Sequence, residues 1–129
     1  MSKFYDLVQE ICLKDSRYKP DAYEFVLQGL EFTRKKLKKT AHLTGAELAR
    51  GLRDYAINQY GPLALSVLAR WGVNQTIDFG NIVFNMVEMK LLSKTKEDNL
   101  LDFNRVYDFK AAFSNVLADS VIAAFKGKA

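Results

Sequence analysis

Apolar residues recur every three or four positions along most of the chain, which is the pattern of helices that bury one face. Five such segments predict helices over residues 3–14, 20–36, 44–59, 62–71 and 76–90. The same spacing continues after Asp108 and predicts a sixth helix that reaches about Lys126. Pro and Gly are scarce, with two and seven residues, which favours helices over a strand-and-turn architecture. We therefore predict a mainly α fold of about six helices.

Local signals indicate where the helices begin and end. Thr44 and Glu47 have the spacing of a capping box, in which each side chain binds a backbone N–H that the helix leaves free. Pro20 suits the first position of the second helix, because the backbone N–H that proline lacks would have no partner within the helix at that position. The fourth segment, which ends at Gly72, has so little polar surface that we expect it at the centre of the fold.

The stretch after the fifth helix does not follow the helical pattern. Two short apolar runs flank a polar cluster at Glu97, Asp98 and Asn99, which is typical of a turn. This arrangement predicts a small β-hairpin near 91–103. Three helices followed by a hairpin also resemble the order of elements in a winged helix, so a winged-helix-like arrangement of 44–107 is an alternative interpretation.

Length and composition indicate one ordered domain, residues 1–129, since 49% of the 129 residues are hydrophobic and 26% are charged. The first residues lack the continuous apolar run of a signal peptide. No stretch approaches the roughly 20 apolar residues that span a bilayer. The single cysteine, Cys12, cannot form an intramolecular disulfide, which is typical of a reducing compartment. We therefore predict a cytoplasmic protein.

The net charge of +4 comes from one short run. Five of the 19 basic residues lie within six positions, and without them 14 basic residues stand against 15 acidic ones. These five are candidates for contact with an anion or a nucleic acid: Arg34, Lys35, Lys36, Lys38 and Lys39. The alternative is a solvated helix end, where positive charge complements the helix dipole. We favour the second interpretation.

Candidate catalytic groups are few. A zinc site needs several His or Cys ligands, and the chain has only Cys12 and His42. These two could form a nucleophile–base pair, but a buried structural cysteine fits the apolar stripe around Cys12 better. Glu97, Asp98 and Asp102 are close in sequence, yet carboxylates in a polar turn are usually solvated. We predict no cofactor and no metal, and we lean away from an enzyme.

Two further functions stay open. In the winged-helix interpretation, the helix from Thr76 would present Gln75, Asn81 and Asn85 to DNA bases, but this helix contains no Arg. An enzyme would need a pocket that gathers distant polar groups, and the candidates are Arg53, Asp54, Tyr55, Tyr60 and Asp78.

The amount of apolar surface leads to the favoured function. The fourth and fifth helices carry more apolar side chains than a monomer of this size easily buries, which favours a partner or a homo-oligomer. We predict a non-enzymatic binding or protein-interaction module of unknown partner. Nucleic-acid binding is the first alternative, and an uncharacterised enzyme is the second.

Several segments of the chain match one pattern. They are GAEL at 45–48, RDYA at 53–56, YGPLA at 60–64, WGV at 71–73 and DFGNIVFN at 78–85, with FYD at 4–6, YEFV at 23–26 and YDF at 107–109. In these segments the chain resembles the Minf-type family of small bacterial proteins of unknown function, over roughly residues 4–110. The resemblance implies a bacterial, cytoplasmic protein and carries over no activity.

Overall fold

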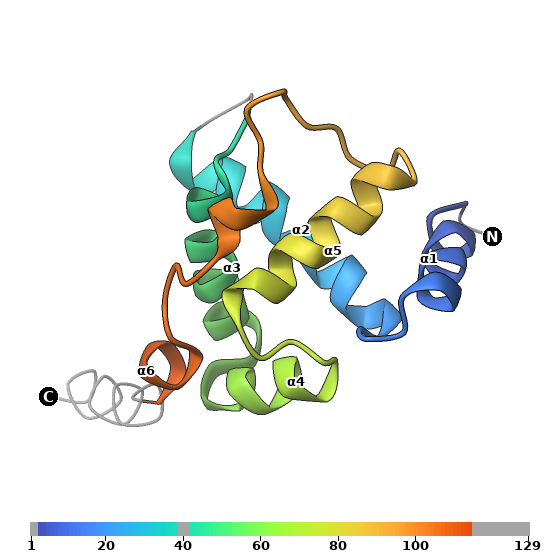
Figure 1. Ribbon diagram of the computed structural model, residues 1–129. Helices are drawn as coiled ribbons and strands as arrows, with labels where there is room; N and C mark the ends of the chain where they lie inside the picture. Colours follow the sequence, from blue (N-terminus) through green and yellow to red (C-terminus); the bar gives the residue numbers. More distant parts are fainter. Residues whose placement is uncertain (1–2, 39–41, 115–129) are drawn as a thin grey trace, which may run out of the picture.

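Helices make up most of what the computed structural model describes, namely residues 3–38 and 42–114 (Figure 1). The α-helices are α1 (Lys3–Lys14), α2 (Pro20–Leu37), α3 (Gly45–Tyr60), α4 (Ala64–Arg70), α5 (Thr76–Glu88) and α6 (Phe109–Phe113). Two short 3-10 helices, η1 (Gly61–Leu63) and η2 (Leu100–Phe103), were not predicted. The mainly helical fold is confirmed, and no described helix is both long and apolar enough to cross a membrane.

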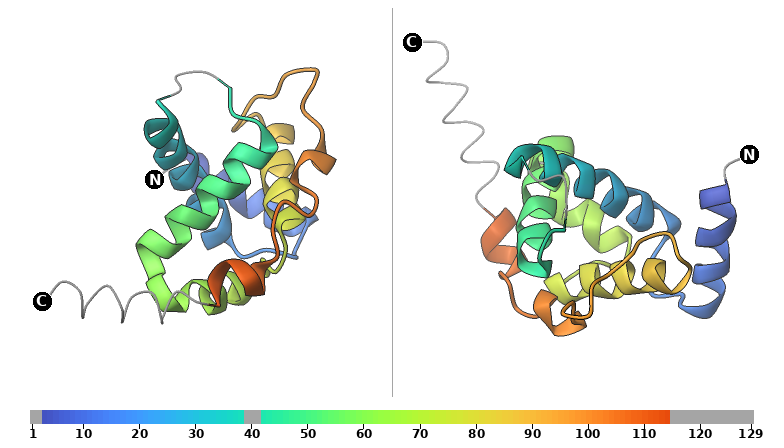
Figure 2. Two further views of the ribbon diagram at one scale, coloured as in Figure 1. Left: turned by 90° about the vertical axis from the view of Figure 1, so that its left-hand side faces the viewer. Right: turned by 90° about the horizontal axis from the view of Figure 1, so that it is seen from above.

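Helix α5 is the centre of the fold. It lies across α2, with α1 toward one end and α3 and η2 toward the other side, and it packs against all four (Figures 1 and 2). Its side chains Phe79, Ile82 and Met86 are completely buried. Because α5 is covered from several directions, polar side chains on it must find partners within the chain.

The α2 and α3 helices pack closely at Gly51. A Cβ atom at this position would overlap the side chain of Thr33 on α2, so only glycine fits this contact without a shift of the neighbouring helix. The buried Thr33 hydroxyl donates to the carbonyl of Gly29, 2.7 Å away, and is therefore satisfied within its own helix. This contact fixes the spacing of the helices whose ends meet the site described below.

The predicted capping box at the start of α3 is confirmed. The Glu47 N–H donates to Thr44 Oγ1 at 3.1 Å, and the Thr44 N–H donates to Glu47 Oε1 at 2.9 Å. The predicted first residue of α2, Pro20, is also correct. Gly72 follows α4 with a φ of +90°, a conformation that glycine adopts without strain.

The predicted β-hairpin near 91–103 is wrong. No strand occurs in the described residues, and the segment is a loop followed by η2. The reason is local, because the side chain of Asn99 accepts from the N–H of Leu101 at 2.9 Å while Asp102 accepts from the N–H of Asn99 at 3.0 Å. These caps start a helical turn, and Phe103 at its end is buried against α5. The winged-helix-like arrangement of 44–107 therefore lacks its wing.

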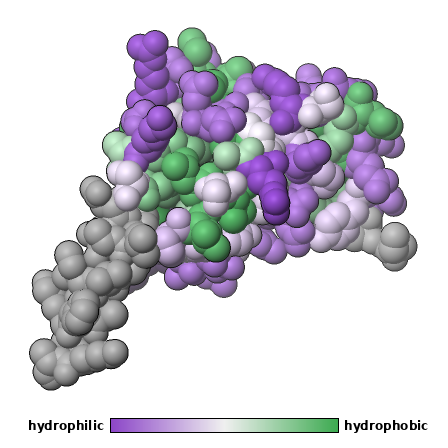
Figure 3. Space-filling model, turned by 90° about the horizontal axis from the view of Figure 1, so that it is seen from below, coloured by the Kyte–Doolittle hydropathy of each residue, from purple (hydrophilic) through white to green (hydrophobic). Residues whose placement is uncertain are grey.

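The expected central place of the fourth helix is also wrong. Pro62 belongs to the 3-10 turn η1, so α4 has only seven residues and buries only Ala64 and Leu68. Leu63 is 63% exposed. Figure 3 shows the face of the molecule on which α4 lies, where a group of apolar residues is bordered by polar ones. Helix α4 therefore lies at the outside of the fold, with only Ala64 and Leu68 in the core.

The last predicted helix begins where expected. The Asp108 side chain accepts from the N–H of Ala111 at 2.9 Å and caps α6. Phe109 and Phe113 of α6 are buried, and α6 packs against α4. The rest of the predicted helix, residues 115–126, lies outside the described residues.

Candidate functional site

A cavity of about 460 Å³ lies between the C-terminal half of α2, the start of α3, the end of α5 and the loop up to η2. This volume is within the range of small-molecule sites, which are mostly apolar with a few polar groups. Its apolar lining comes from all these elements: Leu30, Leu43, Leu48, Val83, Phe84, Leu91, Leu92 and Phe103. Several of these side chains pack on the core while keeping part of their surface open to the cavity.

The acidic groups of the rim are engaged within the chain. Asp98 Oδ1 pairs with His42 Nε2 at 2.7 Å and so joins the segment before α3 to the loop after α5. The other oxygen of Asp98 accepts from the N–H of Thr95 at 2.7 Å. Asp102 caps η2, as described above. These contacts shape the rim, and they occupy carboxylate oxygens that would otherwise be acceptors for a ligand.

Arg34 differs from these groups because part of its side chain lacks a partner. Its NH1 nitrogen contacts Glu31 Oε1 at 2.9 Å, and the Glu31 side chain is 62% exposed. Its Nε is buried and has no hydrogen-bond partner among the described residues. The side chain as a whole is 36% exposed and lines the cavity, so a ligand in the cavity can contact its open part, whereas the enclosed Nε takes an acceptor only when the side chain shifts. A buried unsatisfied donor is rare and calls for an explanation.

The structure divides the predicted basic run. Lys36 Nζ contacts Asp54 Oδ2 at 2.7 Å, tying α2 to α3, and lies over the ring of Phe32. Burial alone would raise the pKa of Asp54, but hydrogen bonds from Lys36 and Arg53 lower it. Lys35 and Lys38 are exposed on the surface, and Lys39 lies outside the described residues. Arg34 is thus the member of the run that lines the cavity.

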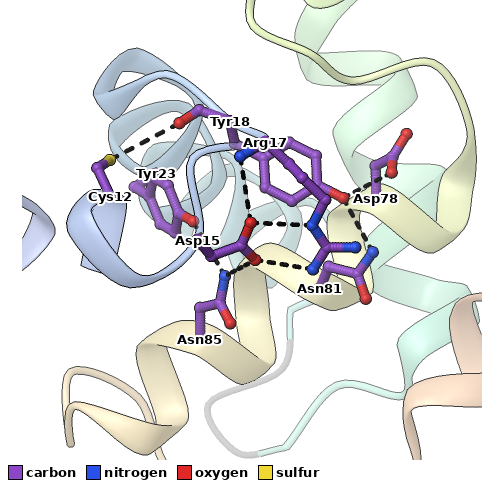
Figure 4. A network of polar contacts seen from close by, with 8 residues as sticks. All are labelled: Cys12, Asp15, Arg17, Tyr18, Tyr23, Asp78, Asn81 and Asn85. Carbon is purple, nitrogen blue, oxygen red and sulfur yellow. Dashed lines mark hydrogen bonds and ion pairs between the residues drawn. The ribbon is translucent and has the colours of Figure 1, made fainter.

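A polar network connects the turn between α1 and α2 to α5 (Figure 4). Asp15 accepts from Arg17 Nε at 2.9 Å and NH2 at 2.7 Å, and from the side-chain amide of Asn85 at 2.9 Å. The hydrogen bonds from Arg17 hold the pKa of Asp15 well below its ordinary value. The amide of Asn85 also reaches the hydroxyl of the buried Tyr23, at 3.1 Å.

Tyr18 forms the second half of this network. Its hydroxyl donates to Asp78 Oδ1 at 2.6 Å and accepts from the side-chain amide of Asn81 at 2.9 Å. Burial, and then the hydrogen bond to Asp78, raise the pKa of Tyr18 well above its ordinary value. The other Asp78 oxygen accepts from the N–H groups of Asn74 and Gln75 and so caps α5. Each of these side chains has a partner within the chain, as expected of a structural network.

These contacts remove the basis of the DNA-reading interpretation. Asn81 and Asn85 face the turn between α1 and α2 and are used by the network (Figure 4). Gln75 is exposed but lies at the cap of α5. The helix predicted to enter the major groove is instead the buried centre of the fold.

The five polar groups predicted as candidates for an enzyme active site have different partners in the structure. Arg53 pairs with Asp54, the Tyr55 hydroxyl donates to Gln28, and Tyr60 packs against Trp71. Asp78 belongs to the network around Tyr18. Their contacts therefore give no shared pocket.

The named cysteine, histidine and carboxylates are also kept apart or used locally. Cys12 donates to the Tyr18 carbonyl at 3.7 Å, whereas His42 pairs with Asp98, so the two form no nucleophile–base pair. Burial raises the pKa of the Cys12 thiol. Asp98 and Asp102 serve as caps, and Glu97 is exposed. Within 3–38 and 42–114, no group of three or more His, Cys, Asp or Glu side chains could hold a metal ion.

Sequence reasoning missed both the cavity and the network. The cavity is built from four segments, and no one segment carries a recognisable pattern. The sequence contains one weak signal of the network. Asp15 lies two positions before Arg17 at the end of a predicted helix, a spacing that is compatible with the ion pair between them. The partners on α5 lie 63 and 70 positions further along the chain and could not be paired with it from spacing alone.

The comparisons with known proteins add no further information, because no family model, no curated protein and no solved structure matches the chain. The resemblance to the Minf-type family therefore stays a prediction. What the site does must be argued from its own geometry.

Proposed function

We propose that this protein is a non-enzymatic binding module, and that the cavity between α2, the start of α3, the end of α5 and η2 is its binding site. The observation that carries the proposal is the combination of an apolar lining with the buried, unpartnered Nε of Arg34. Leaving a buried donor unsatisfied costs about 1–3 kcal/mol, and a ligand that accepts a hydrogen bond there removes this cost.

The contacts of the rim support a role in shaping a binding site. Asp98 is engaged on both oxygens, and its pairing with His42 Nε2 joins the segment before α3 to the loop after α5. These contacts hold two segments around the cavity.

The protein-interaction form of the prediction has weaker support. The most exposed leucines, Leu13, Leu63 and Leu101, belong to α1, η1 and η2, which are different elements. Single exposed apolar residues are normal on a monomer and do not define an interface. A protein partner, a homo-oligomer, a bacterial source and a cytoplasmic location stay predictions.

The proposal is tested with N-phenyl-1-naphthylamine, an uncharged apolar fluorophore, and with a variant that fills the cavity. Ser93 lines the cavity and is exposed, so Ser93→Trp should place an indole in the cavity without a change in the core. The matched control is Ser114→Trp, at an exposed serine next to α6 that does not line the cavity.

We expect saturable binding of one fluorophore per chain to the wild type and to Ser114→Trp, and a loss of at least about tenfold in affinity in Ser93→Trp. Circular dichroism and thermal unfolding verify that both variants keep the fold. Binding that is equally strong in Ser93→Trp, or that does not saturate in the wild type, contradicts the proposal.

A further inference from the structure

We infer that the ligand of this cavity is a small organic carboxylate with an apolar body, and that Arg34 binds its carboxylate group. This inference rests on the proposed function and specifies its ligand.

The strongest acceptors of the cavity are at least partly used by the chain. The carboxylates on its rim, Asp98 and Asp102, already accept hydrogen bonds from the chain. The buried Nε of Arg34 is a donor with no acceptor among the described residues. A ligand that complements this arrangement brings an acceptor to Arg34 and needs no strong donor of its own.

The charges favour an anionic acceptor over a neutral one. Arg34 is always positively charged, and hydrogen bonds between a guanidinium and a carboxylate are about twice as strong as those between neutral groups. Lys94 places a second positive charge at the rim, where it is exposed and donates to the carbonyl of Thr95 at 3.2 Å. Of the two rim carboxylates, Asp98 is paired with His42 and Asp102 caps η2. Glu31 occupies the NH1 nitrogen of Arg34, and the enclosed Nε keeps no partner among the described residues.

The remaining lining defines the body of the ligand. Val83 and Phe84 from α5 and Leu91 and Leu92 after it present apolar surface, as does Leu30 on the same helix as Arg34. An alkyl or aromatic group would bury this surface, which contributes roughly 25 cal/mol per Å². The His42–Asp98 pair joins the two segments at the rim, and the volume of about 460 Å³ suits a small molecule better than a protein segment.

The test compares octanoate with octanol by isothermal titration calorimetry at pH 7.5. Both have the same alkyl chain, and only octanoate carries the anionic acceptor. Three variants are measured: Arg34→Met, which keeps an unbranched apolar side chain but has no donor; Arg34→Lys, which keeps the charge but not the Nε donor; and Lys35→Met, which removes an adjacent exposed charge outside the cavity.

The inference predicts that the wild type binds octanoate at least about tenfold more tightly than octanol, in proportion to one charge-assisted hydrogen bond. This preference should disappear in Arg34→Met, fall in Arg34→Lys and remain in Lys35→Met. Octanol should bind the wild type and Arg34→Met with similar affinity, which shows that the cavity itself is intact in the variant.

Failure of the inference differs from failure of the proposed function. Equal affinity for octanoate and octanol, with both lost in Ser93→Trp, overturns the carboxylate inference and leaves the binding site in place. A preference for octanoate that is the same in Arg34→Met also overturns the assignment to Arg34. Absence of saturable binding by octanoate, octanol and the fluorophore overturns both proposals.

Discussion

Two regions around α5 differ in how their polar groups are satisfied. Toward the turn between α1 and α2, Asp78 and Asn81 bond to Tyr18, and one turn later Asn85 bonds to Asp15 (Figure 4). At the cavity, which Val83 and Phe84 of α5 help to line, Arg34 keeps a buried donor without a partner beside apolar side chains. A satisfied network stabilises a fold, whereas an unsatisfied group beside a cavity leaves a role for a ligand. Polar residues alone therefore do not indicate a binding site; the state of their hydrogen bonds does.

The largest effect on stability is expected from Asp78→Ala. This change leaves the Tyr18 hydroxyl without its acceptor and removes the cap from the N–H groups of Asn74 and Gln75. The loss of a cap and of a partly buried hydrogen bond should lower the free energy of unfolding by about 3 kcal/mol, measured by urea denaturation. Asp78→Asn keeps one acceptor and should lose less. Equal stability of Asp78→Ala and the wild type would show that the network is not structural.

Tyr18→Phe should have the next largest effect. The phenylalanine keeps the buried ring but removes the hydroxyl that lies between Asp78 and Asn81. We expect a loss of about 1.5 kcal/mol in the free energy of unfolding and no change in octanoate affinity. Tyr5→Phe, at a tyrosine that is 46% exposed and whose hydroxyl hydrogen-bonds to Glu24, is the control for an exposed hydrogen bond and should lose much less stability than Tyr18→Phe. A loss of octanoate binding in Tyr18→Phe would break the distinction between the two regions.

Asp15 should make stability depend on pH in the acid range. Its pKa in the folded protein is lowered by Arg17, whereas an unfolded aspartate has a pKa of about 3.9. The contribution of the Asp15 carboxylate is therefore complete above about pH 5 and is lost as the pH falls below about 4. Since Arg17 is 59% exposed, we expect the free energy of unfolding of Asp15→Asn at pH 7 to be only about 1 kcal/mol below that of the wild type. This difference in the free energy of unfolding should be smaller at pH 3. A larger difference at pH 3 would contradict a stabilising role of the Asp15 carboxylate.

Arg34→Met should have the smallest effect on stability, although it changes a charged and partly buried residue. The substitution removes an unsatisfied donor, which favours the fold, and an exposed contact with Glu31, which opposes it, so the free energy of unfolding should not fall by more than about 0.5 kcal/mol. Urea denaturation of Arg34→Met and of Tyr18→Phe under the same conditions compares the two changes in the free energy of unfolding directly. A loss above about 1.5 kcal/mol would show that Arg34 supports the fold, and the argument for a ligand at this position would fail.

Features set by a few neighbouring residues could be predicted from the sequence. The capping box of Thr44 and Glu47 and the start of α2 at Pro20 depend on contacts within one helical turn. The hairpin near 91–103 was wrong because the caps at Asn99 and Asp102 outweigh a poor strand pattern. The cavity could not be predicted at all, because it depends on how four distant segments pack.

The most direct test of the central claim is a map of amide chemical-shift changes when octanoate is added to the isotopically labelled wild-type protein. Our account predicts saturable changes at the Arg34 Nε–H and at the backbone amides of 42–45 and 91–95, with residues 15–18 and 78 unchanged. Changes centred on residues 15–18 and 78, or changes spread over the surface without saturation, would contradict the claim that this cavity is the binding site.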